Sequence, residues 1–175
     1  MASYLVLPTP VGEAAVRAEG GAITGLFLKG QRHAPALSWE ELPRETSDSL
    51  LLAANAWLIR YFAGENPPVD LPLEPPGTAF QRAVWALLTE IPYGKTVTYG
   101  DLARRLSSSP RAVGGAVGRN PISILIPCHR VVGAGGSLTG YAGGLAAKKL
   151  LLALEEEHAS ASKANIPPAP AGQGE

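Results

Sequence analysis

The chain has 175 residues, of which 46% are hydrophobic, 17% charged and 6% aromatic. This suffices for one ordinary domain, or for two small domains that share an interface. Fifteen basic and fifteen acidic side chains cancel, so no long-range field indicates a nucleic-acid partner. The single cysteine excludes an internal disulfide and a zinc site built mainly from cysteines.

No apolar run reaches the roughly 18 residues of a membrane span. The first residues also lack the basic region of a signal peptide. We therefore expect a cytoplasmic protein with no membrane partner.

The first part of the chain combines short strands with one helix. Apolar runs bounded by proline and glycine predict strands at residues 4–7, 14–16 and 23–28. Apolar side chains at helical spacing from Leu50 to Phe62, followed by Gly64, predict a helix. We expect these elements to form an N-terminal α/β domain over residues 1–66.

Residues 65–77 contain five prolines and no periodic pattern. Such a composition is typical of a stiff connector. The domain boundary is therefore predicted here, with the connector over residues 67–77.

The second part begins with three predicted helices. Thr78 and Gln81 have the spacing of a capping box at the start of the first, which ends at the turn 92–94. A short helix over 98–106 is followed by the turn 107–109 and a third helix that runs toward Asn120. The last two fit a helix-turn-helix, although many helical hairpins share this pattern.

A compact apolar run at 122–126, a glycine-rich loop and a last helix ending in three glutamates complete this part. We expect a second domain over residues 78–158 and a disordered tail over 159–175. The expected fold class is α/β (α+β). A small strand-and-helix domain would precede a mostly helical, winged-helix-like domain.

Basic residues gather in one segment of this neutral protein. Residues 95–130 contain six basic side chains and one acidic side chain. The excess suggests a confined anionic contact, and the alternative is a solvated helical surface.

The lone cysteine has unusual neighbours. An isolated cysteine is most often a small buried hydrophobic residue. Cys128, however, lies between Pro127 and two potentially cationic residues, His129 and Arg130, and nearby positive charge favours the nucleophilic thiolate. Adjacent residues of a strand point to opposite faces, so His129 can act as its base only if the chain turns at Pro127 or a water bridges the two.

These residues resemble a known active-site signature. Asn120-Pro121 followed by residues 124–132, with the string PCHRV, is similar to that of the 6-O-alkylguanine-DNA alkyltransferases, or methylated-DNA–protein-cysteine methyltransferases. The similarity covers about residues 78–156 and is only loose over residues 1–66. It implies that the domain over residues 78–158 binds DNA and accepts the alkyl group.

The resemblance implies a DNA-repair reaction on a base rotated out of the duplex, at a cost of a few kcal/mol. It assigns Arg111 to the vacated space in the stack and Tyr99 to the flanking phosphate. Small residues of the third helix would let it approach the DNA. The implied DNA-binding residues are Tyr99, Gly100, Arg111, Ala112 and Arg119.

The resemblance also implies the chemistry. Cys128 would attack the alkyl carbon, His129 would take the thiol proton through a water, and Glu155 would orient His129. Tyr99 would give a proton to the leaving guanine, and Asn120 would brace the turn before the cysteine. The implied substrate pocket contains Val117, Val131, Tyr141 and Ala142. The thioether product has no carbonyl for water to attack, so each molecule would react once.

No cofactor and no metal are expected, and His33 and His158 are interpreted as surface or packing residues. The expected partner is double-stranded DNA containing alkylated guanine, with 4-O-alkylthymine as a further candidate substrate. The protein would be a monomer that could cluster on DNA and associate with the nucleoid. One alternative is a helix-turn-helix module that recognises alkylated DNA without transfer. A weaker one is a cysteine hydrolase, because hydrolases usually draw their histidine from a remote part of the chain.

Overall fold

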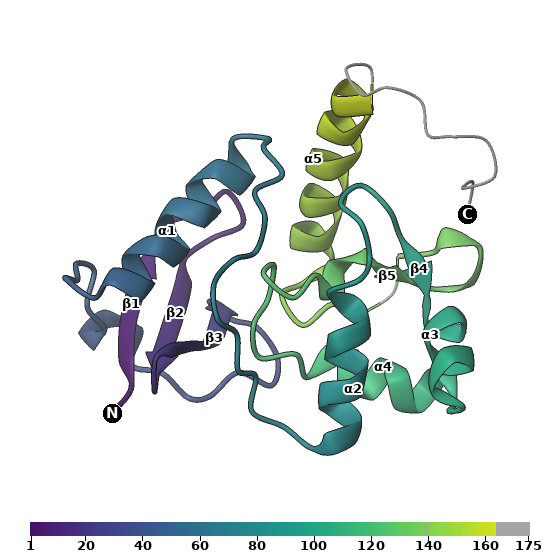
Figure 1. The fold of residues 1–175 in the computed structure, drawn as a ribbon, viewed down its shortest axis with the longest axis horizontal. Coiled ribbons are helices and arrows are strands. Elements are labelled where there is room, and N and C mark those ends of the chain that lie inside the picture. The colour runs from purple at the N-terminus through teal and green to yellow at the C-terminus, as the bar shows by residue number, and fades with distance from the viewer. Residues whose placement is uncertain (139, 164–175) are drawn as a thin grey trace.

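The computed structural model describes residues 1–138 and 140–163. Strands β1 (Ser3–Leu7), β2 (Ala14–Glu19) and β3 (Ala22–Leu28) form an antiparallel sheet in that order. Helix α1 (Ser49–Phe62) packs against this sheet, after a short 3-10 turn at Trp39–Glu41 (Figure 1). The three strands and the helix predicted in this part of the chain are confirmed.

The edge of β3 is covered by two segments from later in the chain. The Ile23 N–H donates to the Pro72 carbonyl at 2.8 Å, and the Glu74 N–H donates to the Ile23 carbonyl at 2.9 Å. Further along, the Leu26 N–H donates to the Pro121 carbonyl at 2.9 Å. The proline-rich connector and the loop before Cys128 thus satisfy an edge that would otherwise be open.

Helices make up most of the second part. They are α2 (Ala79–Leu88), α3 (Tyr99–Leu106) and α4 (Pro110–Gly118), and α3 and α4 are joined by residues 107–109. The short strands β4 (Val97–Thr98) and β5 (Val131–Val132) pair in parallel. The fold is the expected mixed α/β class, with a small antiparallel sheet and a helix-turn-helix.

Side-chain caps begin these helices. Thr78 and Gln81 form the predicted capping box of α2, and Thr98 and Asp101 form another at the start of α3. Ser109 caps α4, whose first residue is Pro110. The start of α3 is therefore fixed beside β4, which places Tyr99 next to α4.

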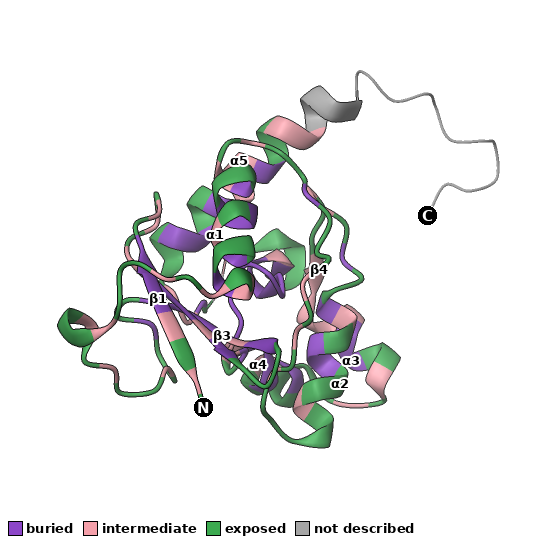
Figure 2. Cartoon of the chain, turned by 60° about the vertical axis from the view of Figure 1, so that its left-hand side comes forward, coloured by how far each residue is buried: buried purple, intermediate pink, exposed green. Residues whose placement is uncertain are grey.

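The buried side chains of both parts form one continuous hydrophobic cluster. Figure 2 shows the buried residues of both parts in purple. Trp57 and Tyr61 of α1 belong to the same cluster as Trp85 of α2 and Leu151 of α5. The two domains proposed for residues 1–66 and 78–158 therefore follow one another along the chain but share a single hydrophobic core.

The last helix, α5 (Leu145–Lys163), extends beyond residue 158, where the predicted tail was to begin. Its later turns have packing partners elsewhere in the chain: His158 packs against Gly64, and Ala159 packs against Gly94. The predicted boundary was therefore too early. Residues 164–175, the rest of that tail, lie outside the described residues. Within residues 1–138 and 140–163, no helix is long and apolar enough to cross a membrane.

Candidate active site

The chain turns at Cys128. Residues Cys128–Arg130 form a single turn of 3-10 helix directly after Pro127. The turn removes the geometry of a flat strand, in which Cys128 and His129 would point to opposite faces. Of the two arrangements that the sequence left open, the structure thus contains the turn at Pro127.

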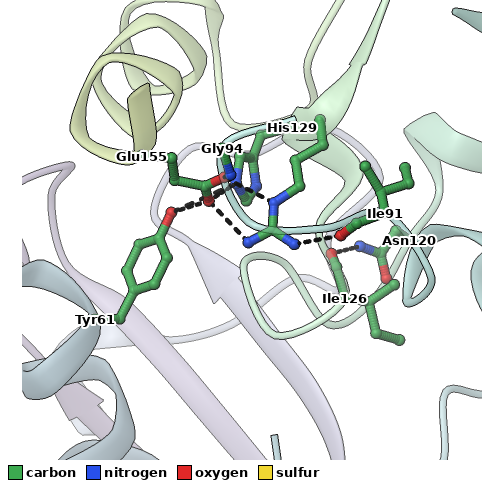
Figure 3. Close-up of polar contacts among 8 residues, drawn as sticks. Tyr61, Ile91, Gly94, Asn120, Ile126, His129 and Glu155 are labelled. Carbon is green, nitrogen blue, oxygen red and sulfur yellow. Dashed lines mark hydrogen bonds and ion pairs between the residues drawn. The ribbon is translucent and has the colours of Figure 1, made fainter. Parts of the chain in front are cut away.

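The loop before Cys128 is held by Asn120. The side-chain oxygen of Asn120 accepts from the Ile122 N–H at 3.0 Å, and its amide donates to the Ile126 carbonyl at 2.9 Å (Figure 3). Ile124, inside this loop, has φ 71°, a left-handed conformation that is strained for a β-branched residue. Asn120 therefore joins the end of α4 to a tightly constrained turn, as expected of a brace.

The thiol of Cys128 is buried, and its surroundings do not favour the thiolate, contrary to the expectation from the sequence. Cys128 is only 4% exposed. Burial raises the pKa of the Cys128 thiol, and the Asn120 amide and the Lys148 ammonium oppose this only in part. The expectation that two flanking cations would favour the thiolate is therefore wrong, because the cost of desolvation is larger and Arg130 turns toward Glu155.

The cation near the thiol is Lys148, which the sequence analysis missed. Its ammonium is fully buried and donates to the Val131 carbonyl at 2.6 Å. Burial lowers the pKa of Lys148, whereas Cys128 raises it. Lys148, Leu151 and Glu155 are buried at helical spacing on α5, and this register is the signal that could have revealed the lysine.

Glu155 is the centre of a buried network. Its Oε2 lies 2.6 Å from Nε2 of His129, and Arg130 donates to both carboxylate oxygens at 2.8 and 3.0 Å (Figure 3). The Gly94 N–H donates to Oε1 at 3.1 Å. Gly94 has a φ of 77°, a left-handed conformation that glycine adopts without strain. The Tyr61 hydroxyl donates to Oε2 at 2.6 Å. The neighbouring Glu156 and Glu157 are exposed, so the structure brings only Glu155 of the three to His129.

The charges of this network leave His129 neutral. Burial alone would raise the pKa of Glu155, but its hydrogen bonds with His129 and Arg130 and the charge of the Arg130 guanidinium lower it to about 2. Burial lowers the pKa of His129, and the Glu155 carboxylate opposes this only in part. Arg130 is always positively charged, so it balances the negative charge of the Glu155 carboxylate by itself. The imidazole of His129 therefore does not need to carry a proton on both nitrogens.

The tautomer of His129 follows from its partner. An ionised carboxylate can only accept, so Nε2 donates to Glu155 and Nδ1 keeps a free lone pair. Nδ1 is buried and forms no hydrogen bond with any residue in the described part of the chain. The site therefore contains a neutral imidazole that can accept a proton at Nδ1.

A pocket of about 210 Å³ lies between the helix-turn-helix and two loops. Five predicted site residues line it: Tyr99, Val117, Arg119, Tyr141 and Ala142. Cys128 does not line the pocket itself. Tyr141 lines the pocket and also interacts with Cys128: burial raises the pKa of Tyr141 well above its usual value, and Cys128 adds to this effect.

One expectation about this pocket needs correction. Val131 does not line it, because Val131 belongs to β5, pairs with Val97 and is completely buried. His33 is exposed, as expected of a surface residue, and it also lines the pocket beside Arg32. Arg32 belongs to the same rim because its N–H donates to the Ala142 carbonyl at 2.9 Å. His158, by contrast, packs against Gly64, as expected.

The residues predicted to bind DNA lie on or beside the helix-turn-helix. Arg111, Ala112 and Arg119 are exposed, and Tyr99 and Gly100 are half-buried at the start of α3. Gly114 of α4 lies against the Tyr99 ring, and a Cβ at this position would make an ordinary van der Waals contact with the ring at 3.7 Å.

The free positive charge on this face is smaller than the sequence count suggested. Arg104, Arg105 and Arg130 form ion pairs with Asp101, Glu90 and Glu155. Arg111 and Arg119 form none with the residues that the structure describes, which leaves them available for phosphates.

No group of three or more His, Cys, Asp or Glu side chains within residues 1–138 and 140–163 is arranged to hold a metal ion.

Residues 79–157 match the family described as 6-O-methylguanine DNA methyltransferase, DNA binding domain. A methylated-DNA–protein-cysteine methyltransferase of Haemophilus influenzae is 46% identical over 159 residues, which cover 87% of this chain and 86% of that protein. The chain belongs to this methyltransferase family. The match is longer than residues 79–157 and therefore includes residues of the N-terminal part as well.

Solved structures of the family have the same fold. The crystal structure of Mycobacterium tuberculosis OGT in complex with DNA has a TM-score of 0.79 and 39% identity, over 89% of this chain and 94% of that one. An O6-methylguanine DNA methyltransferase from Methanococcus jannaschii has a TM-score of 0.64 and 28% identity, over 98% of this chain and all of that one. The similarity thus includes both the sheet and the helical part.

Proposed function

We propose that this protein repairs DNA by transferring the alkyl group of 6-O-alkylguanine to Cys128, after rotation of the base out of the duplex. One observation carries the proposal: the single cysteine is directly followed by the buried His129, whose Nε2 lies 2.6 Å from the Glu155 carboxylate. Membership of the methyltransferase family and the similarity to a relative in complex with DNA support it.

The transfer is a displacement at carbon. Cys128 Sγ forms a bond to the alkyl carbon while the bond from that carbon to guanine O6 breaks. Because burial raises the pKa of the thiol, its proton must leave during the reaction, and Nδ1 of His129 accepts it through a water. The leaving guanine receives a proton from the Tyr99 hydroxyl, which lies in the pocket wall.

The product explains the stoichiometry. An alkyl thioether has no carbonyl for water to attack, unlike the acyl-cysteine of a hydrolase. Cys128 is therefore consumed, and the protein acts as a reagent. We further propose that it acts as a monomer on chromosomal DNA in the cytoplasm.

Intact mass spectrometry tests this function. Incubation with duplex DNA containing 6-O-methylguanine should add one methyl group to the Cys128 peptide, and the reaction should stop at one per protein. No increment would favour the module that binds alkylated DNA without transfer. Sustained turnover would favour a hydrolase.

Arg111 is proposed to fill the space that the rotated base leaves. Arg111→Ala should slow methyl transfer from duplex DNA by about tenfold or more, because unstacking costs a few kcal/mol. Reaction with the free base 6-O-benzylguanine should be almost unchanged. Single-turnover rates on both substrates measure this, with Arg44→Ala, on the sheet side of the molecule, as the control. Equal losses on both substrates would contradict the role.

A further inference from the structure

Tyr61 belongs to α1, far from Cys128 in sequence, yet it contacts the centre of the active-site network. Its hydroxyl donates to Oε2 of Glu155 at 2.6 Å, the same oxygen that lies 2.6 Å from Nε2 of His129 (Figure 3). The hydroxyl oxygen is also 3.4 Å from that imidazole nitrogen. Tyr61 and His129 therefore share one carboxylate oxygen.

Aromatic packing fixes the position of this hydroxyl. The Tyr61 ring stacks on Trp57 with centroids 5.3 Å apart and meets the edges of Phe62 and Tyr93 at 5.2 and 6.2 Å. The Trp57 indole N–H in turn lies 3.2 Å from the carbonyls of Pro67 and Pro68 in the connector. Tyr61 is 1% exposed, so water does not compete for its hydrogen bond.

We propose that Tyr61 is a positioning residue for alkyl transfer, through which the N-terminal part of the chain sets the basicity of His129. The inference rests on the proposed function, since it concerns the base of that reaction. The hydroxyl is a neutral donor that takes part of the electron density of Oε2 without contributing charge. The other groups bonded to this oxygen are His129 and Arg130. The ammonium of Lys148 also acts on His129 and, like Arg130, lowers its pKa.

Removing the hydroxyl has a defined consequence. Oε2 would then accept only from His129 and Arg130, and the carboxylate would attract a proton on His129 more strongly. The pKa of His129 would rise, and a larger share of the imidazole would carry a second proton near neutral pH. Burial raises the pKa of the Tyr61 hydroxyl far above its usual range, so the donor persists throughout the pH range of an assay.

The test compares Tyr61→Phe with Tyr93→Phe in the full chain. Tyr93 is a matched control because its hydroxyl is buried in the same cluster but forms no hydrogen bond with the described residues. Single-turnover transfer from free 6-O-benzylguanine is followed by intact mass between about pH 5 and pH 9, where histidine titrates. We expect the acid limb of the pH–rate profile of Tyr61→Phe to move to higher pH by about half to one unit. At a given pH on that limb, transfer would then be about three- to tenfold slower than in the wild type. Tyr93→Phe should keep the wild-type profile.

A second measurement does not depend on transfer. The chain has three histidines, so NMR can follow the titration of His129 in each variant. Tyr61→Phe should raise this titration midpoint, even if the variant is less stable. An unchanged midpoint and an unchanged acid limb would overturn the inference and leave Tyr61 as a packing residue. Absence of any mass increment in the wild-type protein would instead refute the proposed function, while the NMR comparison would still decide the role of Tyr61.

Discussion

The Cys128→Ser protein is expected to transfer no alkyl group but to bind DNA almost as the wild type does. Serine retains the approximate size of the side chain, but its hydroxyl is much less acidic and less nucleophilic than a thiol. The proposed DNA contacts on α4 lie elsewhere, and Cys128 does not line the pocket. DNA affinity should therefore stay within about twofold, a change of about 0.4 kcal/mol.

Two assays separate these effects. Intact mass after incubation with 6-O-methylguanine DNA should show no increment for Cys128→Ser, and fluorescence anisotropy at fixed salt should give its DNA affinity. Cys128→Ala serves as a control without any hydroxyl in the buried site. A collapse of DNA binding in both variants would mean that the cysteine has a structural role, as in the interpretation of the chain as a binding module.

Local patterns predicted the elements of this fold well. The caps at Thr78 and Ser109 mark helix starts because a side chain must satisfy free backbone N–H groups there. The apolar run 122–126 was harder to interpret, since only tertiary contacts show that it pairs with β3 and turns at Ile124. The end of α5 depended similarly on packing between Ala159 and Gly94, which a composition of small polar residues does not reveal.

The site was predictable where a short motif contains its residues. Cys128 and His129 are adjacent, and the structure brings Asn120 and Glu155 to them as expected. Tyr61 is 94 residues from Glu155 and lies on an apolar helix face, where an aromatic residue looks like part of the core. No local pattern could show that its hydroxyl reaches the network.

Electrostatics were the least predictable from sequence order. Arg130 is two residues from Cys128 but binds Glu155, whereas the cation near the thiol is Lys148, twenty positions away along the chain. Proximity in sequence therefore gave the wrong partner for the thiol. The direction of the shift also depends on burial, which raises the pKa of Cys128 and makes a base necessary.

Glu155→Gln should have the largest effect on stability. Glu155 is 1% exposed and accepts hydrogen bonds from Tyr61, His129, Arg130 and Gly94. Glutamine lacks the charge and places an amide donor among these donors, so Arg130 loses its counter-charge. Removing one partner of a buried ion pair costs about 3–5 kcal/mol. Alkyl transfer should slow about 100-fold or more, because the base loses its orientation.

The pH dependence has a definite sign. The pKa of Glu155 is lowered from 4.5 to about 2 in the folded protein, so its carboxylate stabilises the fold above pH 4.5. This contribution, about 3 kcal/mol, is lost as the pH falls from 4.5 toward 2. The difference in free energy of unfolding between the wild type and Glu155→Gln should therefore have its full value at pH 7 and be clearly smaller at pH 3.

Urea denaturation at both pH values measures this difference, and Glu156→Gln is the matched control. Glu156 is the next residue on the same helix but is exposed, so its replacement should change the free energy of unfolding by less than about 0.5 kcal/mol. If both variants unfold like the wild type, the Glu155 network does not hold the two parts of the chain together. If Glu155→Gln is destabilised but transfers at the wild-type rate, the carboxylate stabilises the fold without orienting His129.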